Sequence, residues 1–488
     1  MSSAVLADSS DAIRAAPQPA QGRRRGFLSV QQECDGIDLR VQGRLPEWLV
    51  GTYVLNGPAQ WELPKRSYAH WFDGLAMLHG FRIQPGRVHY RNRFLRSQDW
   101  RESHANGRPQ LGGYDTAPAG GLLSRIVHMF NPRRSDNGCV VAMHQDGQWF
   151  ALTESDRVMR FDGQTLDTQG EVAWTEGGKL PLLAAHPCID AQGRWWNVGV
   201  SLGRECEYVL FSCDVRGHRA VKARIPVKRA GYLHAFAMTA THTVIWECAW
   251  RAHPLRFLFA GESYARHFDW MPEGGSRLHT VRLSDGAVRS WDAPPLVLFH
   301  ASQAFDAGGD VVVDLCLNDE PVVEELHIAR LRAGMPVTSM LARHARFVLS
   351  PGASTAREEA LPGRFELPQV NARVATRGAA RYVWGATTAD STPGEFFNRT
   401  LRLDLQTGEM HQAGRDDAFA LEPLFVPNPN GIAEDDGVLL VHTLADDDPG
   451  SRIRVLDAAT LDERAAIELP HVIPFGFHGA WLAVRPIR

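Results

Sequence analysis

The sequence feature that most constrains the fold is a short unit that returns along the chain: an alternating apolar and polar run, a tight polar turn, and a second alternating run. Six such units lie at residues 78–94, 158–174, 208–225, 278–291, 399–412 and 452–469. A turn between two runs with a period of two residues predicts a β-hairpin. Hairpins repeated over most of the chain indicate the blades of a propeller.

The predicted fold class is therefore all-β, a β-propeller with short helices and loops capping one face. Few long helical periodicities separate the hairpins, and radial repetition protects sheet edges, which favours a propeller over a sandwich. The repeats are too divergent to fix the blade number, and roughly six to eight blades would suit them. No linker rich in Pro, Gly and Ser divides the chain, so we expect residues 26–488 to form one domain.

The first 25 residues have a different composition from the rest of the chain. They combine small residues, Pro and Asp with a basic run, and they contain no apolar core segment. This pattern fits neither a secretory signal nor a membrane anchor, and we expect residues 1–25 to be a disordered arm. Elsewhere the most apolar runs, such as residues 311–317, are too short to span a bilayer and predict buried strands.

Charge and cysteine content restrict the partners and the compartment. A formal net charge of -4 gives no overall attraction for nucleic acid, so we expect no nucleic-acid partner. The seven cysteines are odd in number, scattered and free of a C-x-x-C pair, which favours a reducing compartment such as the cytoplasm. Two apolar stretches, 121–130 and 255–259, predict either a peripheral contact with a membrane or capping helices with buried stripes.

Four of the twenty histidines stand in apolar or small-residue contexts typical of strands. They are His186 in AAHPCID, His234 in GYLHAFAMT, His300 in LFHASQAFD and His478 in FGFHGAWL. A buried imidazole must either satisfy both ring nitrogens or bind a ligand. Strands of different blades converge on the axis of a propeller, so histidines far apart in sequence can meet there.

Imidazole ligands alone do not decide the identity of the metal, because iron, copper, nickel and zinc all bind imidazole. Four histidines would complete a tetrahedral zinc site and leave no position for chemistry. An octahedral iron(II) ion would keep two positions free. Taken singly, each of these histidines is more often a hydrogen-bonded core residue than a ligand.

A set of ordered motifs identifies a resemblance that runs from about residue 30 to the C-terminus. The motifs are GRLPEWLVGTYVLNGP, AHWFDGLAMLHGF, AHPCID, GYLHAFAMT, LFHASQAFD, FELPQVN, LEPLFVPNP and IPFGFHGAW. In this order they resemble the carotenoid cleavage oxygenases, a family that includes the vertebrate retinoid isomerase, stilbene-cleaving enzymes and apocarotenoid oxygenases. The resemblance implies a seven-bladed propeller with one axial iron(II) per chain, bound by the four histidines named above.

The resemblance also implies three glutamates around the metal ligands. They match Glu154 in FALTESD, Glu366 in GRFELPQVN and Glu422 in ALEPLFVP, and would accept hydrogen bonds from His234, His300 and His478 respectively. His186 would have no such partner. A carboxylate in this place fixes the tautomer and the ring orientation of the ligand and makes it more basic.

The activity implied by the resemblance is oxidative cleavage of a C=C bond by O2, which gives two carbonyl products from an apolar polyene. Stilbene-cleaving members carry a lysine immediately before the first glutamate, whereas this chain has Thr153. We therefore expect a carotenoid or apocarotenoid rather than a phenolic stilbene. Tyr114, in a glycine-rich loop, is a second candidate substrate contact.

Besides cleavage of a stilbene or another phenylpropanoid, three other functions remain as alternatives at this point. The first is a retinoid isomerase-like activity without cleavage, which the motifs allow. The second is a propeller that has lost catalysis and serves as a binding scaffold. The presence of all seven presumed metal-site residues argues against it. The third is a calcium-dependent propeller hydrolase, which would need converging oxygen ligands in place of histidines.

Overall fold

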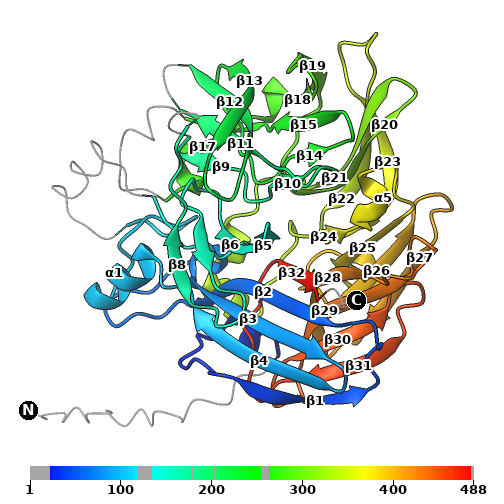
Figure 1. Ribbon diagram of the computed structural model, residues 1–488. Coiled ribbons are helices and arrows are strands. Elements are labelled where there is room, and N and C mark those ends of the chain that lie inside the picture. The colour runs from blue at the N-terminus through cyan, green and yellow to red at the C-terminus, as the bar shows by residue number, and fades with distance from the viewer. Residues whose placement is uncertain (1–21, 119–133, 177–179, 203–204, 254–262, 485–488) are drawn as a thin grey trace, which may run out of the picture.

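The computed structural model describes residues 22–118, 134–176, 180–202, 205–253 and 263–484. In these ranges the strands form seven sheets, of which one has nine strands and one has two. The nine-stranded sheet joins two blades where β31 pairs with β1, and the two-stranded sheet lies outside the ring. The described strands therefore form seven blades, and the predicted all-β propeller is confirmed (Figure 1).

The blades follow one another around the ring in chain order (Figure 1). The first blade consists of β1 (Ile37–Gly43), β2 (Gly51–Gln60), β3 (Leu75–Gln84) and β4 (Arg87–Phe94), with the C-terminal strand β32 (Gly479–Ala483) added beside β2. The second blade consists of β5 (Val141–Gln145), β6 (Gln148–Leu152), β7 (Met159–Phe161) and β8 (Thr168–Glu171). The third consists of β9 (Leu182–Leu183), β10 (Cys188–Ile189), β11 (Trp195–Ser201), β12 (Cys206–Cys213) and β13 (Arg219–Val227).

The remaining four blades complete the ring. The fourth consists of β14 (Ala237–Met238), β15 (His242–Glu247), β18 (Ser276–Arg282) and β19 (Val288–Ala293), and the fifth of β20 (Leu298–Ala307), β21 (Asp310–Leu317), β22 (Arg343–Leu349) and β23 (Arg357–Arg364). The sixth consists of β24 (Glu366–Gln369), β25 (Tyr382–Thr387), β26 (Arg399–Asp404) and β27 (Met410–Gly414), and the seventh of β28 (Ala418–Pro427), β29 (Gly437–Ala445), β30 (Arg452–Asp457) and β31 (Glu463–Glu468). Since β31 pairs with β1 and β32 with β2, both ends of the chain help to close the ring.

The six hairpins predicted from the sequence are confirmed, and each forms two neighbouring strands of a blade. In four of these blades they are the two outer strands, and in the first and the seventh β1 pairs beyond them. The corresponding hairpin of the fifth blade, β22 with β23, was not predicted. Its second strand, REEALPGR, is largely polar and contains a proline, so it lacks the period of two that marks the other strands. The apolar run at 311–317 lies in β21, which is buried as predicted.

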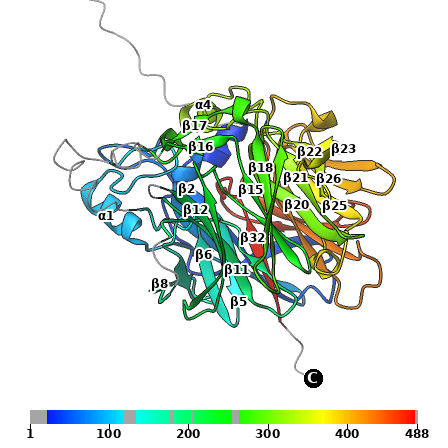
Figure 2. The ribbon, with the colours of Figure 1, turned by 90° about the horizontal axis from the view of Figure 1, so that it is seen from above.

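Short helices and the two-stranded sheet cover one face of the ring (Figure 2). The small sheet is β16 (Trp250–Ala252) with β17 (Phe268–Trp270). The helices of the described chain are η1 (Gly22–Phe27), η2 (Trp71–Asp73), α1 (Gln98–Asn106), η3 (Ala265–His267), η4 (Pro272–Gly274), η5 (Glu324–Leu326), α4 (Ile328–Arg332), α5 (Ala372–Ala375) and η6 (Ala389–Ser391). α1 begins at the cap Ser97, whose side chain accepts from the backbone N–H of Trp100, and ends at Gly107 with a φ of 69°.

The arm was expected to extend to residue 25, but Gly22–Phe27 forms η1, in which the Arg25 guanidinium donates to backbone oxygens of residues 445–449. These bonds anchor the segment on the last blade, so the expected boundary lies inside an ordered element. The apolar stretches 121–130 and 255–259 lie outside the described residues. Within the described ranges, no helix is long and apolar enough to cross a membrane.

Buried aromatic and aliphatic side chains hold adjacent blades together. The largest cluster joins three blades, and Trp196, Trp246 and Phe347 are among its members. A second cluster lies under the capping elements and is rich in aromatic rings, including Trp71, Phe299 and Phe477. This aromatic cluster adjoins the residues that the sequence singled out, because Phe299 and Phe477 directly precede His300 and His478.

Candidate metal centre

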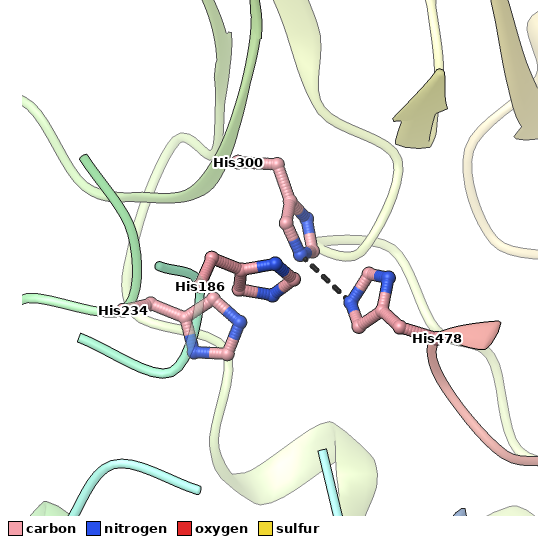
Figure 3. A group of neighbouring side chains, drawn as sticks. All are labelled: His186, His234, His300 and His478. Carbon is pink, nitrogen blue, oxygen red and sulfur yellow. Dashed lines mark hydrogen bonds between the residues drawn. The ribbon is translucent and has the colours of Figure 1, made fainter. Parts of the chain in front are cut away.

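The structure brings the four predicted histidines together (Figure 3). One ring nitrogen from each of His186, His234, His300 and His478 lies within 4.8 Å of those of the other three. His186 lies between β9 and β10, His234 precedes β14, His300 is in β20 and His478 precedes β32. Residues that are nearly 300 positions apart in sequence thus meet because their blades converge on one axis.

Three of the histidines donate their Nδ1–H groups to glutamate carboxylates, of which those of Glu366 and Glu422 are buried. His234 is bonded to Glu154 at 2.5 Å, His300 to Glu366 at 2.6 Å, and His478 to Glu422 at 2.7 Å. These pairs join the same residues as the resemblance implies, while their role around a metal stays a prediction. Such a bond assigns the proton of a neutral imidazole to Nδ1 and leaves a lone pair on Nε2.

The arrangement of these Nε2 atoms suits a cation. The Nε2 atoms of His300 and His478 face each other at 3.2 Å (Figure 3). With both protons on Nδ1, two lone pairs point at each other, and a positive charge between them removes their repulsion. First-row metals bind imidazole nitrogen at about 2.0–2.1 Å, so two ligands at right angles would lie about 3 Å apart. The observed separation therefore fits two neighbouring ligands of one metal ion.

His186 differs from the other three because none of the glutamates accepts from it. Its Nε2 atom is buried and has no hydrogen-bond partner in the described chain, which is rare for a buried polar atom and points to a missing ligand. Burial lowers the pKa of His186 well below its usual value, and the three neighbouring histidines lower it further. The ring is therefore neutral at pH 7 and keeps a lone pair for a metal.

Irregular backbone places several of these side chains. The register of β20 shifts on both sides of Ala301, next to His300. The register also shifts in β24 after Glu366 and in β28 around Glu422, and Leu367 has a φ of +52°. Bulges turn side chains away from the regular alternation and are common near functional sites. The four histidines and the three glutamates come one from each blade, with Glu154 two residues after the end of β6.

Sequence reasoning missed several groups that complete the site. The Tyr232 hydroxyl donates to the same Glu154 oxygen as His234, and it lies 3.4 Å from Nδ1 of His234. Gln369 and the backbone of Gly479 donate to Glu422 at 2.9 and 2.7 Å. Tyr232 could have been found from its place two residues before His234 in GYLHAFAMT, since alternate residues of an extended segment share a side.

Apolar and aromatic side chains surround the histidines. The ring of Phe299 lies 5.3 Å from His234 between centroids, and Phe72 lies 5.8 Å from Phe299 and 5.0 Å from Phe477. Of the two predicted substrate contacts, Thr153 is half-buried beside Glu154, and Tyr114 is buried 5.0 Å from Phe72. Such walls exclude water and suit an apolar ligand.

Comparisons with known proteins agree with this architecture. The chain is 31% identical to carotenoid cleavage dioxygenase 8 homolog A of Oryza sativa subsp. japonica, over 93% of this chain and 86% of the relative. It is 28% identical to apocarotenoid-15,15'-oxygenase of Synechocystis sp., over 94% of this chain and 95% of the relative. The solved structure of cobalt-substituted Synechocystis apocarotenoid oxygenase superposes with a TM-score of 0.84 at 26% identity, over 95% of this chain and 98% of that chain.

The fold and the site define a seven-bladed propeller with a four-histidine centre on its axis. A family model described as retinal pigment epithelial membrane protein matches residues 27–483, and the chain belongs to this family. Because the relatives are named as carotenoid cleavage dioxygenases and an apocarotenoid oxygenase, the predicted membership of the carotenoid cleavage oxygenases is confirmed. With it, the classification as a dioxygenase is confirmed as well.

Proposed function

We propose that this protein is a non-haem iron(II) dioxygenase that cleaves a C=C bond of a carotenoid or apocarotenoid with O2 into two carbonyl products. The observation that carries the proposal is the convergence of four imidazoles. Three of them are buried, and each of these three has its Nε2 lone pair freed by a carboxylate at Nδ1. Relatives named as carotenoid cleavage dioxygenase and apocarotenoid oxygenase support the substrate class.

The cofactor in this proposal is one iron(II) per chain, held by His186, His234, His300 and His478. A relative whose solved structure is described as cobalt-substituted supports a transition metal at the equivalent place. Four neutral ligands leave the charge of the ion undiminished, which disfavours loss of an electron to form iron(III). Bound iron(II) would supply the position at which O2 binds and is activated.

The residues of the chain supply orientation and exclusion of water. Glu154, Glu366 and Glu422 hold three imidazole rings in one tautomer and one orientation. Phe72, Phe299 and their aromatic neighbours would hold an alkene beside the metal. The position of the polyene substrate along this aromatic wall would select the double bond that reacts. In this proposal Thr153 and Tyr114 contact the substrate.

The cellular setting follows from the same proposal. The seven cysteines are free thiols, which supports a reducing compartment, and we propose the cytoplasm. A water-insoluble polyene must be collected from lipid, so we also propose peripheral contact with membranes through residues 121–130 and 255–259.

The direct test is an aerobic reaction of the iron-loaded protein under labelled oxygen, ¹⁸O₂. The substrates are a panel of carotenoids, apocarotenals and hydroxylated stilbenes, and the products are identified by mass spectrometry. We expect two carbonyl products from a carotenoid or apocarotenal, each with one labelled oxygen, and none from His300→Ala protein. An isomerised polyene without oxygen uptake would show a retinoid isomerase-like activity instead, and cleavage by metal-free protein would contradict the iron assignment.

A further inference from the structure

The carboxylate of Glu422 accepts hydrogen bonds from three donors. Its Oε1 atom accepts from Nδ1 of His478 at 2.7 Å and from the side-chain amide of Gln369 at 2.9 Å. Its Oε2 atom accepts from the backbone N–H of Gly479 at 2.7 Å. The imidazole and the side-chain amide therefore share one acceptor oxygen.

The other two carboxylates repeat this arrangement. Oε1 of Glu154 accepts from Nδ1 of His234 at 2.5 Å and also from the hydroxyl of Tyr232. Oε2 of Glu366 accepts from Nδ1 of His300 at 2.6 Å and from the backbone N–H of the next residue at 3.1 Å. In all three pairs, the oxygen that supports a histidine is thus shared with a second donor. These second donors are chemically different: a hydroxyl, a backbone amide and a side-chain amide.

The backbone of β24 places Gln369 for its contact. Glu366 is the first residue of this strand and Gln369 the last, and the register against β25 shifts between them. With this shift, Glu366 reaches His300 of the fifth blade, and Gln369 reaches Glu422 of the seventh. One short strand therefore takes part in the support of both His300 and His478, whose Nε2 atoms lie 3.2 Å apart.

A second donor limits the charge that a carboxylate passes to the imidazole. A carboxylate behind a ligating histidine makes the ring more basic, because it attracts the proton on Nδ1. A second donor on the same oxygen competes for that charge, and a hydrogen bond to an ionised group is roughly twice as strong as one between neutral groups. The ring therefore stays closer to a neutral imidazole than it would beside a carboxylate without the second donor.

The position of Glu422 does not depend on Gln369 alone. The Glu422 side chain is buried, and the bonds from His478 and from the backbone of Gly479 hold both of its oxygens. Both bonds would remain if the Gln369 amide were removed. We therefore expect the loss of this donor to change the charge at His478 more than the position of its ring.

We propose that Gln369 and Tyr232 limit the negative charge that Glu422 and Glu154 pass to their histidines, and thereby help to keep the bound iron divalent. Each acts on a histidine through a glutamate rather than on the metal directly. The inference rests on the iron centre of the proposed function. Four neutral ligands favour iron(II), whereas ligands that carry more negative charge favour iron(III).

The test measures the midpoint potential of the iron(III)/iron(II) couple in the iron-loaded protein. A redox titration followed by the electron paramagnetic resonance signal of iron(III) gives this potential, and competition with a chelator gives the affinity for iron(II). Gln369→Met keeps the length of the side chain without the donor, and Tyr232→Phe removes only the hydroxyl. Each should lower the potential by about 59 mV, a tenfold change in relative affinity for the two states and about the effect of one charged hydrogen bond. Neither should weaken the binding of iron(II).

Matched variants separate this effect from others. Gln412→Met, at an exposed position on β27, and Tyr382→Phe, on β25, should leave the potential and the affinity unchanged. In Glu422→Gln protein, Gln369→Met should cause no further change in potential, because the charge on which it acts is already absent. Tyr232→Phe should still lower the potential in that protein, since it acts on another carboxylate.

Two results would overturn the proposal. Weaker binding of iron(II) with an unchanged potential would show that the two side chains only hold the carboxylates in place. A full effect of Gln369→Met on the potential of Glu422→Gln protein would show that Gln369 does not act through Glu422. Circular dichroism checks the fold of every variant, and if either Gln369→Met or Tyr232→Phe fails to fold, the other decides the test.

The outcome is separable from that of the proposed cleavage. If the potentials shift as expected in a protein that cleaves no polyene, this inference stands and the cleavage proposal fails. If the protein cleaves a polyene and both variants keep the potential of the unmodified protein, the cleavage proposal stands and this inference fails.

Discussion

Glu366 offers the sharpest test of the three His–Glu pairs. Its side chain is 4% exposed, and one oxygen accepts from Nδ1 of His300 at 2.6 Å and from the backbone of Leu367 at 3.1 Å. The other oxygen is buried without a described partner. Glu366→Gln keeps the volume and one acceptor oxygen, but it removes the charge and places an amide N–H₂ where no acceptor is described.

The expected magnitude follows from these contacts. A hydrogen bond to an ionised carboxylate is roughly twice as strong as one between neutral groups, and loss of a partner behind a metal ligand typically costs about 10–100-fold in metal affinity. Because glutamine retains an acceptor, we expect Glu366→Gln at the low end, about tenfold or about 1.4 kcal/mol. Glu366→Ala leaves Nδ1 of His300 unsatisfied, and we expect about 100-fold.

The assay is competition for iron(II) between the protein and a coloured chelator under anaerobic conditions. Glu273→Gln, at an exposed position in η4, is the matched control and should bind iron as the unmodified protein does. Circular dichroism and a thermal unfolding curve check that the variants fold. If Glu366→Gln and Glu366→Ala both retain the affinity of the unmodified protein, Glu366 does not support a metal ligand and the reasoning is refuted.

Three further predictions concern other parts of the chain. The unmodified protein should cleave a carotenoid or apocarotenal at least about ten times faster than a hydroxylated stilbene, since one charged hydrogen bond has about this effect. Thr153→Lys should shift this ratio toward the stilbene. Cleavage of stilbenes by the unmodified protein, with carotenoids inert, would contradict this substrate preference. Burial lowers the pKa of His442 to about 3, so His442 is neutral when folded and takes up a proton on unfolding below pH 6.5. The free energy of unfolding therefore falls as the pH drops. Between pH 7 and pH 5, urea unfolding should show that the free energy of unfolding of His442→Gln falls by about 2 kcal/mol less than that of the unmodified protein. An equal fall in both proteins would refute this prediction. Leu123→Glu with Phe257→Glu should reduce binding to liposomes without unfolding the protein, whereas unfolding would show that these apolar stretches belong to the core.

The sequence predicted the blades well because most outer strands obey a simple alternation. Six hairpins were found in this way, and β22 with β23 was missed because β23 is polar on both faces and contains a proline. The alternation also could not fix the number of blades, which depends on how far each sheet twists and tilts around the axis. The first blade shows a further reason, since it takes β32 from the other end of the chain.

The site depended far more on the resemblance than on local pattern. Each of the seven residues belongs to a different blade, so no spacing in the sequence reports their proximity. The register shifts beside His300 and Glu422 cannot be read from an alternating pattern, because a bulge breaks that pattern. Tyr232 and Gln369 were missed because their roles come from hydrogen bonds to Glu154 and Glu422, which are distant in sequence.

The most direct test of the central claim is metal analysis of the purified protein and of His300→Ala. We expect about one iron per chain in the unmodified protein and loss of most of it in His300→Ala, because removal of a direct ligand should cost more than the roughly 10–100-fold typical of an outer partner. His411→Ala, which removes an exposed histidine on β27, should retain the iron. Circular dichroism should show the same fold in all three proteins. Stoichiometric zinc with no iron, or unchanged iron in His300→Ala, would contradict the assignment of the four histidines to iron.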